Sequence, residues 1–483
     1  PTPLANKYYM VKFDFSNIRT ASNEDTFQGF TLKIITGIMD FQTAYGIFSE
    51  GEMREILGRQ GGNEVYSLFQ SLFRAKRNDQ KLFILIDEYD HFTNELVSFN
   101  LTEFRNIVSR NGYVRKFYEA IKESVGNGIV DRFFATGVTP VTLDSMTSGF
   151  NIGSDLTTSP EFNEMLGFNG DEVRKMLLDL NLNGGEAMYE TLESYYNGSL
   201  FSAKATTKMF NSNMVVNYLN EYQKNSAPPE QLIDTNIASD YAKIRNIFYL
   251  SDEHEKAFEQ ILQTGEVISG ITLKYSFERQ FNLYDFISLL FYNGLLTIKA
   301  PIGAELIFQI PNYAIKTLYW EFFANELISR YNVKYDISDV ATAMRSLAYE
   351  NNVESWIGTI ENILDQLSNR DYIRFDEKYV KLLFFTLAIL SPVYAIKSEP
   401  EVRGEYPDLM YLAREPYKVN YQYLFELKYL PKAGKTKLAT VKKEAREQVQ
   451  RYLQKPEIRQ IANLKAYTVI FVGKKAHIEA VAS

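Results

Sequence analysis

Three residues in the last third of the sequence have the types and the spacing of a small catalytic cluster. Asp408 opens an expected strand, and Glu426-Leu427-Lys428 follows on the next one, eighteen residues later. Side chains alternate between the two faces of a strand, so Glu426 and Lys428 point the same way while Leu427 enters the core. A hairpin would place Asp408 beside Glu426, and the two carboxylates with the Leu427 carbonyl would suit Mg²⁺ or Mn²⁺. A lysine beside such an ion can orient a water and help to deprotonate it, as metal-assisted phosphodiester hydrolysis requires.

The same residues have a plainer interpretation. A lysine and a glutamate can form an ordinary cross-strand pair at the surface, with Asp408 ending a turn. An E-x-K triplet alone carries no weight, because it occurs by chance in most chains. The basic segment beside the cluster favours the catalytic interpretation, since a phosphodiester substrate needs cationic contacts.

A second group of residues, in the first third, suits nucleotide chemistry. The apolar run Leu82–Ile86 ends in Asp87-Glu88, which is the form of a Walker B strand. Asp87 would hold the water shell of a Mg²⁺ ion beside ATP, and Glu88 would polarise the attacking water. Thr136 ends the next apolar run and would contact the γ-phosphate or that water. A strand with a polar cap is the alternative interpretation.

The composition excludes several other chemistries. The 483 residues include no cysteine, which excludes disulfide scaffolds, thiolate nucleophiles and cysteine-ligated metals. No two of the three histidines, His91, His254 and His477, stand at metal-ligand spacing. His91 follows Asp90, and we interpret it as a polar residue at a strand end rather than as a catalytic base.

Charge is distributed unevenly along the chain. The net charge is −8, yet residues 401–483 hold 16 Lys or Arg and 9 Asp or Glu, a net +7, which leaves −15 for residues 1–400. A polyanionic partner would therefore meet the basic tail, although a solvated helix face explains the same charges. The apolar run Leu382–Leu390 is too short to cross a bilayer and no signal peptide opens the sequence, so we expect a soluble, cytoplasmic protein without a membrane partner.

The first third is expected to be an α/β unit. Strands are expected at Tyr8–Phe15, Lys81–Ile86 and Arg132–Gly137, with an amphipathic helix over Phe104–Val125. Nearly unbroken apolar runs are typical of strands buried on both faces of a parallel sheet. Intervening helices imply βαβ crossovers.

The middle of the chain has a mostly helical pattern, interrupted by Pro228-Pro229. A helix over Leu283–Leu296, strands at Leu295–Ile298 and Leu306–Ile310 joined across Pro301-Ile302-Gly303, and a helix over Tyr313–Leu327 have the order of a winged helix. A helical lid with a β-hairpin and no nucleic-acid role is the alternative, which we favour.

The last third is expected to follow the order helix, strand, strand, strand, helix, strand, after helices that begin near Val340. The expected ranges are Glu377–Leu390, Val393–Ser398, Asp408–Ala413, Tyr421–Tyr429, Thr440–Leu453 and Lys465–Val472.

This order, with its acidic residues and lysine, resembles the PD-(D/E)XK nuclease fold. More narrowly, it is similar to the nuclease-like module that follows a predicted AAA-type ATPase in bacterial proteins. The resemblance implies that Asp408 and Glu426 are metal ligands and that Lys428 is the catalytic lysine. It places Glu377 at the position of the first acidic residue, and Gln448 in the helix signature that ends at Tyr452; Glu377 and Gln448 would support the site.

One segment departs from the family pattern. Members often carry Gly-Arg-x-Asp before the strand, whereas this chain has Gly404-Glu405-Tyr406-Pro407-Asp408. Loss of that arginine would weaken phosphate binding, but the core triad is intact.

The part of the chain before this module resembles the predicted AAA-ATPase family that is paired with it, and the two resemblances together cover nearly the whole chain. The segments that carry the resemblance are Ile86–Asp90, Ala135–Val138, Leu143–Ile152, Glu164–Phe168 and Tyr195–Gly198. Because AAA-type modules often form rings, the resemblance makes a homo-oligomer an expected state, although no arginine can be assigned as a trans-acting finger.

The phosphate loop of that family is missing from the sequence. No G-x-x-x-x-G-K-[ST] segment occurs, and the glycine-rich Gly58–Gly62 is not followed by Lys-Ser or Lys-Thr. In the family the loop precedes the strand that corresponds to Tyr8–Phe15, and this sequence begins just before that strand, at Pro1. We expect the segment to have been lost, or never to have belonged to this member; in either case ATP should bind weakly or not at all.

We therefore expect an α/β protein in three parts. Residues 1–160 would form a parallel-sheet core of P-loop or AAA type without its first strand and P-loop. Residues 161–335 would form a helical lid that contains the winged-helix pattern, and residues 336–483 a restriction-endonuclease-like α/β domain.

The leading functional hypothesis is metal-dependent hydrolysis of nucleic acid, with DNA favoured, by the last part. ATP would gate or drive this step in the intact protein through Asp87, Glu88 and Thr136. The alternative is a module that binds nucleic acid or a partner without catalysis, controlled by an ATPase-like switch.

Overall fold

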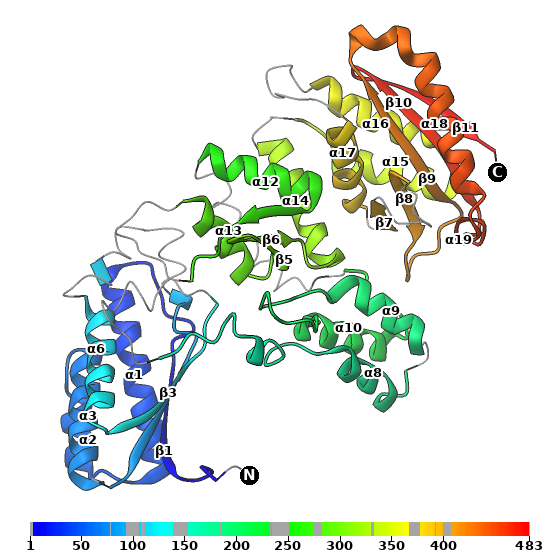
Figure 1. Cartoon of the computed structure of the whole chain (residues 1–483). Helices are drawn as coiled ribbons and strands as arrows, with labels where there is room; N and C mark the ends of the chain where they lie inside the picture. Colours follow the sequence, from blue (N-terminus) through cyan, green and yellow to red (C-terminus); the bar gives the residue numbers. More distant parts are fainter. Residues whose placement is uncertain are drawn as a thin grey trace.

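The computed structural model in Figure 1 describes most of the chain. It covers residues 3–77, 79–92, 106–107, 112–138, 153–182, 185–231, 233, 251–273, 282–329, 333–366, 377–391, 393–398 and 407–482. Among these residues, no helix combines the length and the apolar character needed to cross a membrane.

The first third contains a three-stranded parallel sheet in the order β1-β2-β3, which confirms the expected parallel pairing. Its strands are β1 (Tyr8–Asp14), β2 (Lys81–Asp87) and β3 (Val130–Ala135). The helices α1 (Asn23–Tyr45), α2 (Glu50–Leu57), α3 (Gly62–Lys76) and α6 (Tyr113–Gly126) lie on one side of the sheet (Figure 1). Helix α1 packs closely against β1 at Gly37. A Cβ atom at this position would lie only 2.3 Å from the Lys12 carbonyl oxygen, so the close approach requires glycine.

The strands of this sheet are not buried on both faces as expected. On β1, Val11 and Phe13 are fully buried beneath the helices, whereas Met10, which points the opposite way, is 41% exposed. On β2 the buried and half-buried positions alternate along the whole strand. An unbroken apolar run is therefore compatible with a sheet whose second face is only half covered by the described residues.

Two other expectations for this third need adjustment. Helix α6 begins at Tyr113, directly after its cap residue Gly112, and residues 104, 105 and 108–111 of the expected longer helix lie outside the described part. Strand β3 begins at Val130 and ends at Ala135, two residues earlier at each end than expected.

The middle of the chain is helical, as expected, around a small antiparallel sheet. Its helices are α8 (Gly170–Asp179), α9 (Gly185–Tyr196), α10 (Ser212–Asn225), α12 (Asp252–Thr264), α13 (Leu283–Tyr292) and α14 (Tyr313–Ser329). The sheet has the order β4-β6-β5, with β4 (Glu266–Ser269), β5 (Thr297–Ile302) and β6 (Glu305–Gln309).

The hairpin of this sheet differs in detail from the expectation. Pro301 and Ile302 belong to β5, and the connection is Gly303-Ala304, with Gly303 at a φ of 60°. Proline is tolerated there because β5 is an edge strand that needs no donor on its outer side. The order helix, hairpin, helix is present, while a winged-helix role stays a prediction.

The last third is a five-stranded mixed sheet in the order β11-β10-β9-β8-β7, covered by helices. Its strands are β7 (Tyr394–Ser398), β8 (Leu409–Ala413), β9 (Gln422–Leu430), β10 (Leu464–Val472) and β11 (Lys475–Val481). Its helices are α15 (Ile337–Glu350), α16 (Val353–Gln366), α17 (Glu377–Ile389), α18 (Leu438–Leu453) and α19 (Pro456–Arg459), with the 3-10 helix η3 at Lys432–Lys437.

Strand β11 was not anticipated. It pairs with β10 across the two-residue turn Gly473-Lys474, in which Gly473 adopts a φ of 63°. The strand carries a lysine, a histidine and a glutamate, as charged edge strands often do, and so lacks the apolar run that marked the others.

The two faces of this sheet belong to different apolar clusters. Leu427 and its face-mates pack with α15, α16 and α17 in a large core that also includes middle-part residues. The opposite face packs against α18 through Met410, Leu424 and Val449. The large core crosses from α14 to α17, where the Trp320 and Phe385 rings stack 4.4 Å apart. The borders expected at residues 160 and 335 stay predictions.

Candidate functional site

The structure brings Asp408, Glu426 and Lys428 together where β8 begins, beside the middle of β9. These strands are antiparallel, with Leu409 opposite Phe425, so Asp408 lies just before β8 and beside Glu426. The backbone amide of Leu427 donates a hydrogen bond of 2.9 Å to Asp408 Oδ2. Leu427 is fully buried on the other face, as its alternation along the strand predicted.

The ammonium group of Lys428 lies among three carboxylates. Its Nζ is 2.8 Å from Glu426 Oε1, 3.5 Å from Asp408 Oδ2 and 3.8 Å from Glu377 Oε1. Burial disfavours the charged ammonium, but Asp408 and Glu426 outweigh this effect, so the pKa of Lys428 is raised. Lys428 therefore keeps its proton and is a hydrogen-bond donor in this arrangement.

Glu426 is the most deeply buried member of the cluster. Its side chain is 2% exposed, and its Oε2 atom has no hydrogen-bond partner. Burial, with the nearby negative charge of Asp408, raises the pKa of Glu426 to about 7. A buried carboxylate oxygen without a partner is costly, which suits a position where a cation is meant to bind.

Thr468 is a second buried oxygen beside this carboxylate. It is the β10 partner of Glu426 in the parallel β9–β10 pairing, and so points to the same face of the sheet. Thr468 is fully buried and its Oγ1 also lacks a partner. Sequence reasoning missed this residue, because a single threonine in an apolar strand gives no signal.

Helix α17 supplies two further charged groups. Glu377 is its first residue; burial raises the pKa of Glu377, while Lys428 opposes that effect. One turn later, Lys381 places its Nζ 3.6 Å from Asp408 Oδ1. Lys381 was missed, although a lysine four positions after Glu377, flanked by the apolar residues Val380 and Leu382, was a usable signal.

Gln448 is not joined to this cluster. It is half-buried on α18, and its side chain makes no hydrogen bond to the residues that the structure describes. Its helix neighbours Val449 and Tyr452 are buried against the sheet face that carries Glu426. The supporting role implied for Gln448 stays a prediction.

The donor set fits a divalent cation in its chemistry. Asp408 and Glu426 offer carboxylate oxygens, which Mg²⁺ and Mn²⁺ prefer, and Leu427, which follows Glu426 on β9, would add its carbonyl oxygen. In the described part of the chain, no three Asp, Glu or His side chains are grouped as a metal centre. The fit to a cation therefore rests on the carboxylates of Asp408 and Glu426 and on the Leu427 carbonyl. Of these oxygens, Glu426 Oε2 has no hydrogen-bond partner.

The first third also brings two of its predicted residues into contact. Asp87 ends β2, and the Thr136 hydroxyl donates a hydrogen bond of 2.8 Å to Asp87 Oδ1. Lys12 of β1 lies with its Nζ 3.0 Å from Asp87 Oδ2. The Thr136 and Lys12 hydrogen bonds together lower the pKa of Asp87. Lys12 was not anticipated.

Glu88 turns away from this pair and is conformationally unusual. Its φ is 49°, a left-handed backbone that is costly for a residue with a Cβ. Its carboxylate pairs with His91, at 3.2 Å from Oε2 to Nδ1. The Val138 amide donates to both carboxylate oxygens of the buried Asp90, at 3.0 and 3.1 Å, and this contact fixes the turn after Thr136.

Three segments singled out in the sequence do not contribute described residues to either cluster. Leu143–Ile152 and Gly404–Tyr406 lie outside the described residues. The glycine-rich Gly58–Gly62 connects α2 to α3, with Gly61 as the cap residue of α3.

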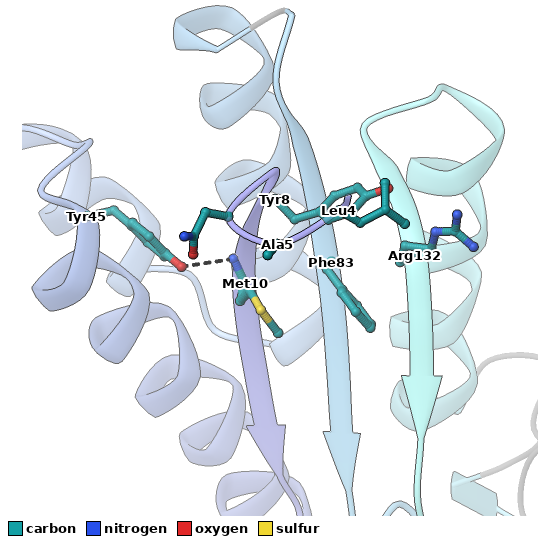
Figure 2. Close-up of a pocket in the computed structure, with 8 residues that line it drawn as sticks. Leu4, Ala5, Tyr8, Met10, Tyr45, Phe83 and Arg132 are labelled. Carbon is teal, nitrogen blue, oxygen red and sulfur yellow. Dashed lines mark hydrogen bonds between the residues drawn. The ribbon is translucent and has the colours of Figure 1, made fainter. Parts of the chain in front are cut away.

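A hollow in the first third lies away from all of these residues. It has a volume of 510 Å³ and opens at the amino-terminal end of the sheet, opposite the end that carries Asp87. In Figure 2 the Tyr45 hydroxyl accepts from the Met10 amide, while Tyr8, Phe83 and Arg132 line the floor from three neighbouring strands.

Comparison with known families confirms the resemblance inferred from the motifs. Residues 1–147 match the family model described as predicted AAA-ATPase, and residues 375–481 match that of the PD-(D/E)XK nuclease superfamily. The chain thus has an AAA-ATPase-like part before a nuclease-like part, in the expected order. No curated protein and no solved structure matches the chain.

Proposed function

We propose that the last part of the chain hydrolyses phosphodiester bonds of nucleic acid in a reaction that needs Mg²⁺ or Mn²⁺. The observation that carries this proposal is the convergence of Asp408, Glu426 and Lys428, with ammonium-to-carboxylate distances of 2.8 and 3.5 Å. The match of this segment to a nuclease superfamily supports it.

The residues have separate roles in this proposal. Asp408 and Glu426, with the Leu427 carbonyl, would hold the cation. When bound, the cation would polarise the scissile phosphate and lower the pKa of a water. Because its pKa is raised, Lys428 would donate a hydrogen bond that orients the water or the phosphate, rather than take a proton.

The basic surface beside the site supports a nucleic-acid substrate. Helix η3 follows directly after β9, and it leads into α18, so the chain that carries Lys428 continues into a lysine-rich segment. Exposed cations there include Lys432, Lys435, Lys437, Lys443 and Arg446. Such side chains bind phosphates irrespective of sequence, and we favour DNA as the substrate.

We further propose that Asp87, Glu88 and Thr136 belong to a nucleotide site through which ATP gates cleavage in the intact protein. The contact between Thr136 and Asp87 supports this role. The sequence has no phosphate loop, so this part alone lacks the backbone cradle that ATP needs.

The test is a cleavage assay with supercoiled plasmid, linear single-stranded DNA and RNA in Mg²⁺, Mn²⁺ or EDTA. We expect DNA cleavage that needs metal and is lost in Lys428→Ala and Glu426→Ala. Preferential cleavage of RNA would overturn the choice of DNA. DNA binding without cleavage under any condition would instead support a non-catalytic binding module.

A further inference from the structure

Lys381 is a buried lysine that the proposed reaction does not yet use. It lies on α17 and is 8% exposed, between Val380 and Leu382, which are buried in the large core. Its Nζ lies 3.6 Å from Asp408 Oδ1, and its charge also acts on Glu377, one helical turn before it. Lysine is almost never this buried unless a partner compensates its charge.

Asp408 is consequently held at both oxygens. Lys381 faces Oδ1, while the Leu427 amide, at 2.9 Å, and Lys428, at 3.5 Å, face Oδ2. With Glu377 and Glu426, the cluster contains three carboxyl groups and two ammonium groups. Each lysine therefore offsets repulsion that would otherwise push the carboxyl groups apart.

We propose that Lys381 is a positioning residue of the nuclease site, which holds the Asp408 carboxylate in place before the cation binds and competes with the cation for its charge. This inference rests on the proposed function for its consequence in catalysis, but the contact can be tested without cleavage. Removal of the charge should make metal binding tighter and, at saturating metal, make turnover slower, because Asp408 is less well fixed.

The experiment uses the full chain and the variant Lys381→Met, which retains most of the buried stem without the charge. Thermal unfolding is followed in EDTA and across a MgCl₂ titration. In EDTA we expect a lower Tm than for wild type, and with Mg²⁺ a larger rise in Tm and an apparent Kd tighter by about tenfold. Cleavage at saturating Mg²⁺ should fall by about tenfold.

Two further variants separate positioning from simple packing. Thr386→Val removes another buried polar group from the same helix, one whose Oγ1 has no partner and lies outside the cluster. Its response to Mg²⁺ should equal that of wild type. Lys381→Arg keeps the charge and should respond nearly as wild type does. An unchanged metal response in Lys381→Met, or an enhanced one in Lys381→Arg, would overturn the proposal.

A double-mutant cycle in EDTA tests the contact independently of metal and cleavage. It combines Lys381→Met with Asp408→Asn and compares the Tm values of the four proteins. If Lys381 acts through Asp408, the Tm losses should be clearly non-additive; additive losses would reject the inference. A wild-type protein that neither binds Mg²⁺ nor cleaves DNA would count against the proposed function, whereas this cycle would still decide the role of Lys381.

Discussion

The two candidate sites are built from similar parts in very different surroundings. At the end of β2, Asp87 pairs with Lys12, and the two side chains are 45% and 56% exposed. Within β9, Glu426 pairs with Lys428, and the exposed fractions of the two side chains are 2% and 23%. The two ion pairs are 3.0 and 2.8 Å long, so their lengths do not distinguish them.

Burial makes the difference between these pairs. Water and salt screen an exposed pair, so either partner can leave at little cost. In a buried pair each charge depends on the other, and removal of one leaves a desolvated charge without compensation. The first pair can therefore exchange partners easily, whereas the charges of the second pair are held in fixed positions.

The largest expected effect is the loss of cleavage in Lys428→Ala. Removal of the ammonium group leaves the buried Glu426 carboxyl group without its ion-pair partner and takes away the proposed hydrogen-bond donor to the water or the phosphate. The cleavage rate should fall by about a hundred- to a thousandfold, measured on plasmid DNA in Mg²⁺.

The matched control is Lys76→Ala in the first third. Lys76 Nζ lies 2.8 Å from Glu52 Oε2, the same separation as in the Lys428–Glu426 pair, but the two side chains are 32% and 26% exposed. Cleavage by this control should equal that of wild type. Equal activity of Lys428→Ala and Lys76→Ala would remove Lys428 from the mechanism.

The next effect concerns stability and pH in EDTA. The pKa of Glu426 is raised from 4.5 to about 7, so over that range the folded protein holds a proton that the unfolded chain releases. Protonated Glu426 therefore contributes fully to the free energy of unfolding below pH 4.5. This contribution of about 2–3 kcal/mol is lost as the pH rises towards 7. In Glu426→Gln, the free energy of unfolding measured in urea should not decline over this pH range. If the free energies of variant and wild type fell in parallel with pH, the prediction would be wrong.

At the exposed Asp87, the pH dependence of the free energy of unfolding should have the opposite sign and be much smaller. The pKa of Asp87 is lowered, so its contribution is present above pH 3.8 and is lost only as the pH falls further. Asp87→Asn should therefore run parallel to wild type between pH 5 and pH 7 in the same urea experiments. A pH-dependent difference within that range would show that Asp87 is more strongly desolvated than its exposure implies.

Breaking the exposed ion pair itself is expected to cost little. Lys12→Met should change the free energy of unfolding by less than about 1 kcal/mol, because the pair is solvated on both sides. Chemical denaturation at low and high salt provides the measurement. A loss above about 2 kcal/mol would mean that the two sites differ less than their burial suggests.

The strands that carry both sites, and the grouping of residues at the second site, could be predicted from the sequence. The parallel strands followed from apolar runs, and alternation along β9 placed Glu426 and Lys428 on one face. The hairpin inference put Asp408 beside Glu426, as the β8–β9 register has it. The burial of Glu426 did not follow, because alternation says which face a residue is on but not what covers that face.

The missed residues share a different cause. Lys12 and Lys381 each reach an ion-pair partner on another element, and Thr468 lies beside Glu426 only through the pairing of β10 with β9, so their positions depend on how elements pack. The second face of the first sheet was misjudged for the same reason, since a run of apolar residues does not reveal whether both sides are covered. Local spacing predicts neighbours along a strand or helix, whereas contacts across elements need the fold.

The smallest effect sharpens the comparison within the buried site. Thr468→Val replaces a fully buried hydroxyl that has no partner by a methyl group of similar shape. No hydrogen bond is lost, so the free energy of unfolding should stay within about 1 kcal/mol of wild type or rise slightly. Thr386→Val, at another unpartnered and fully buried hydroxyl, should behave alike in urea unfolding. Cleavage should be unaffected in both, and a loss of cleavage in Thr468→Val alone would mean that this hydroxyl acts on the Glu426 carboxylate beside it.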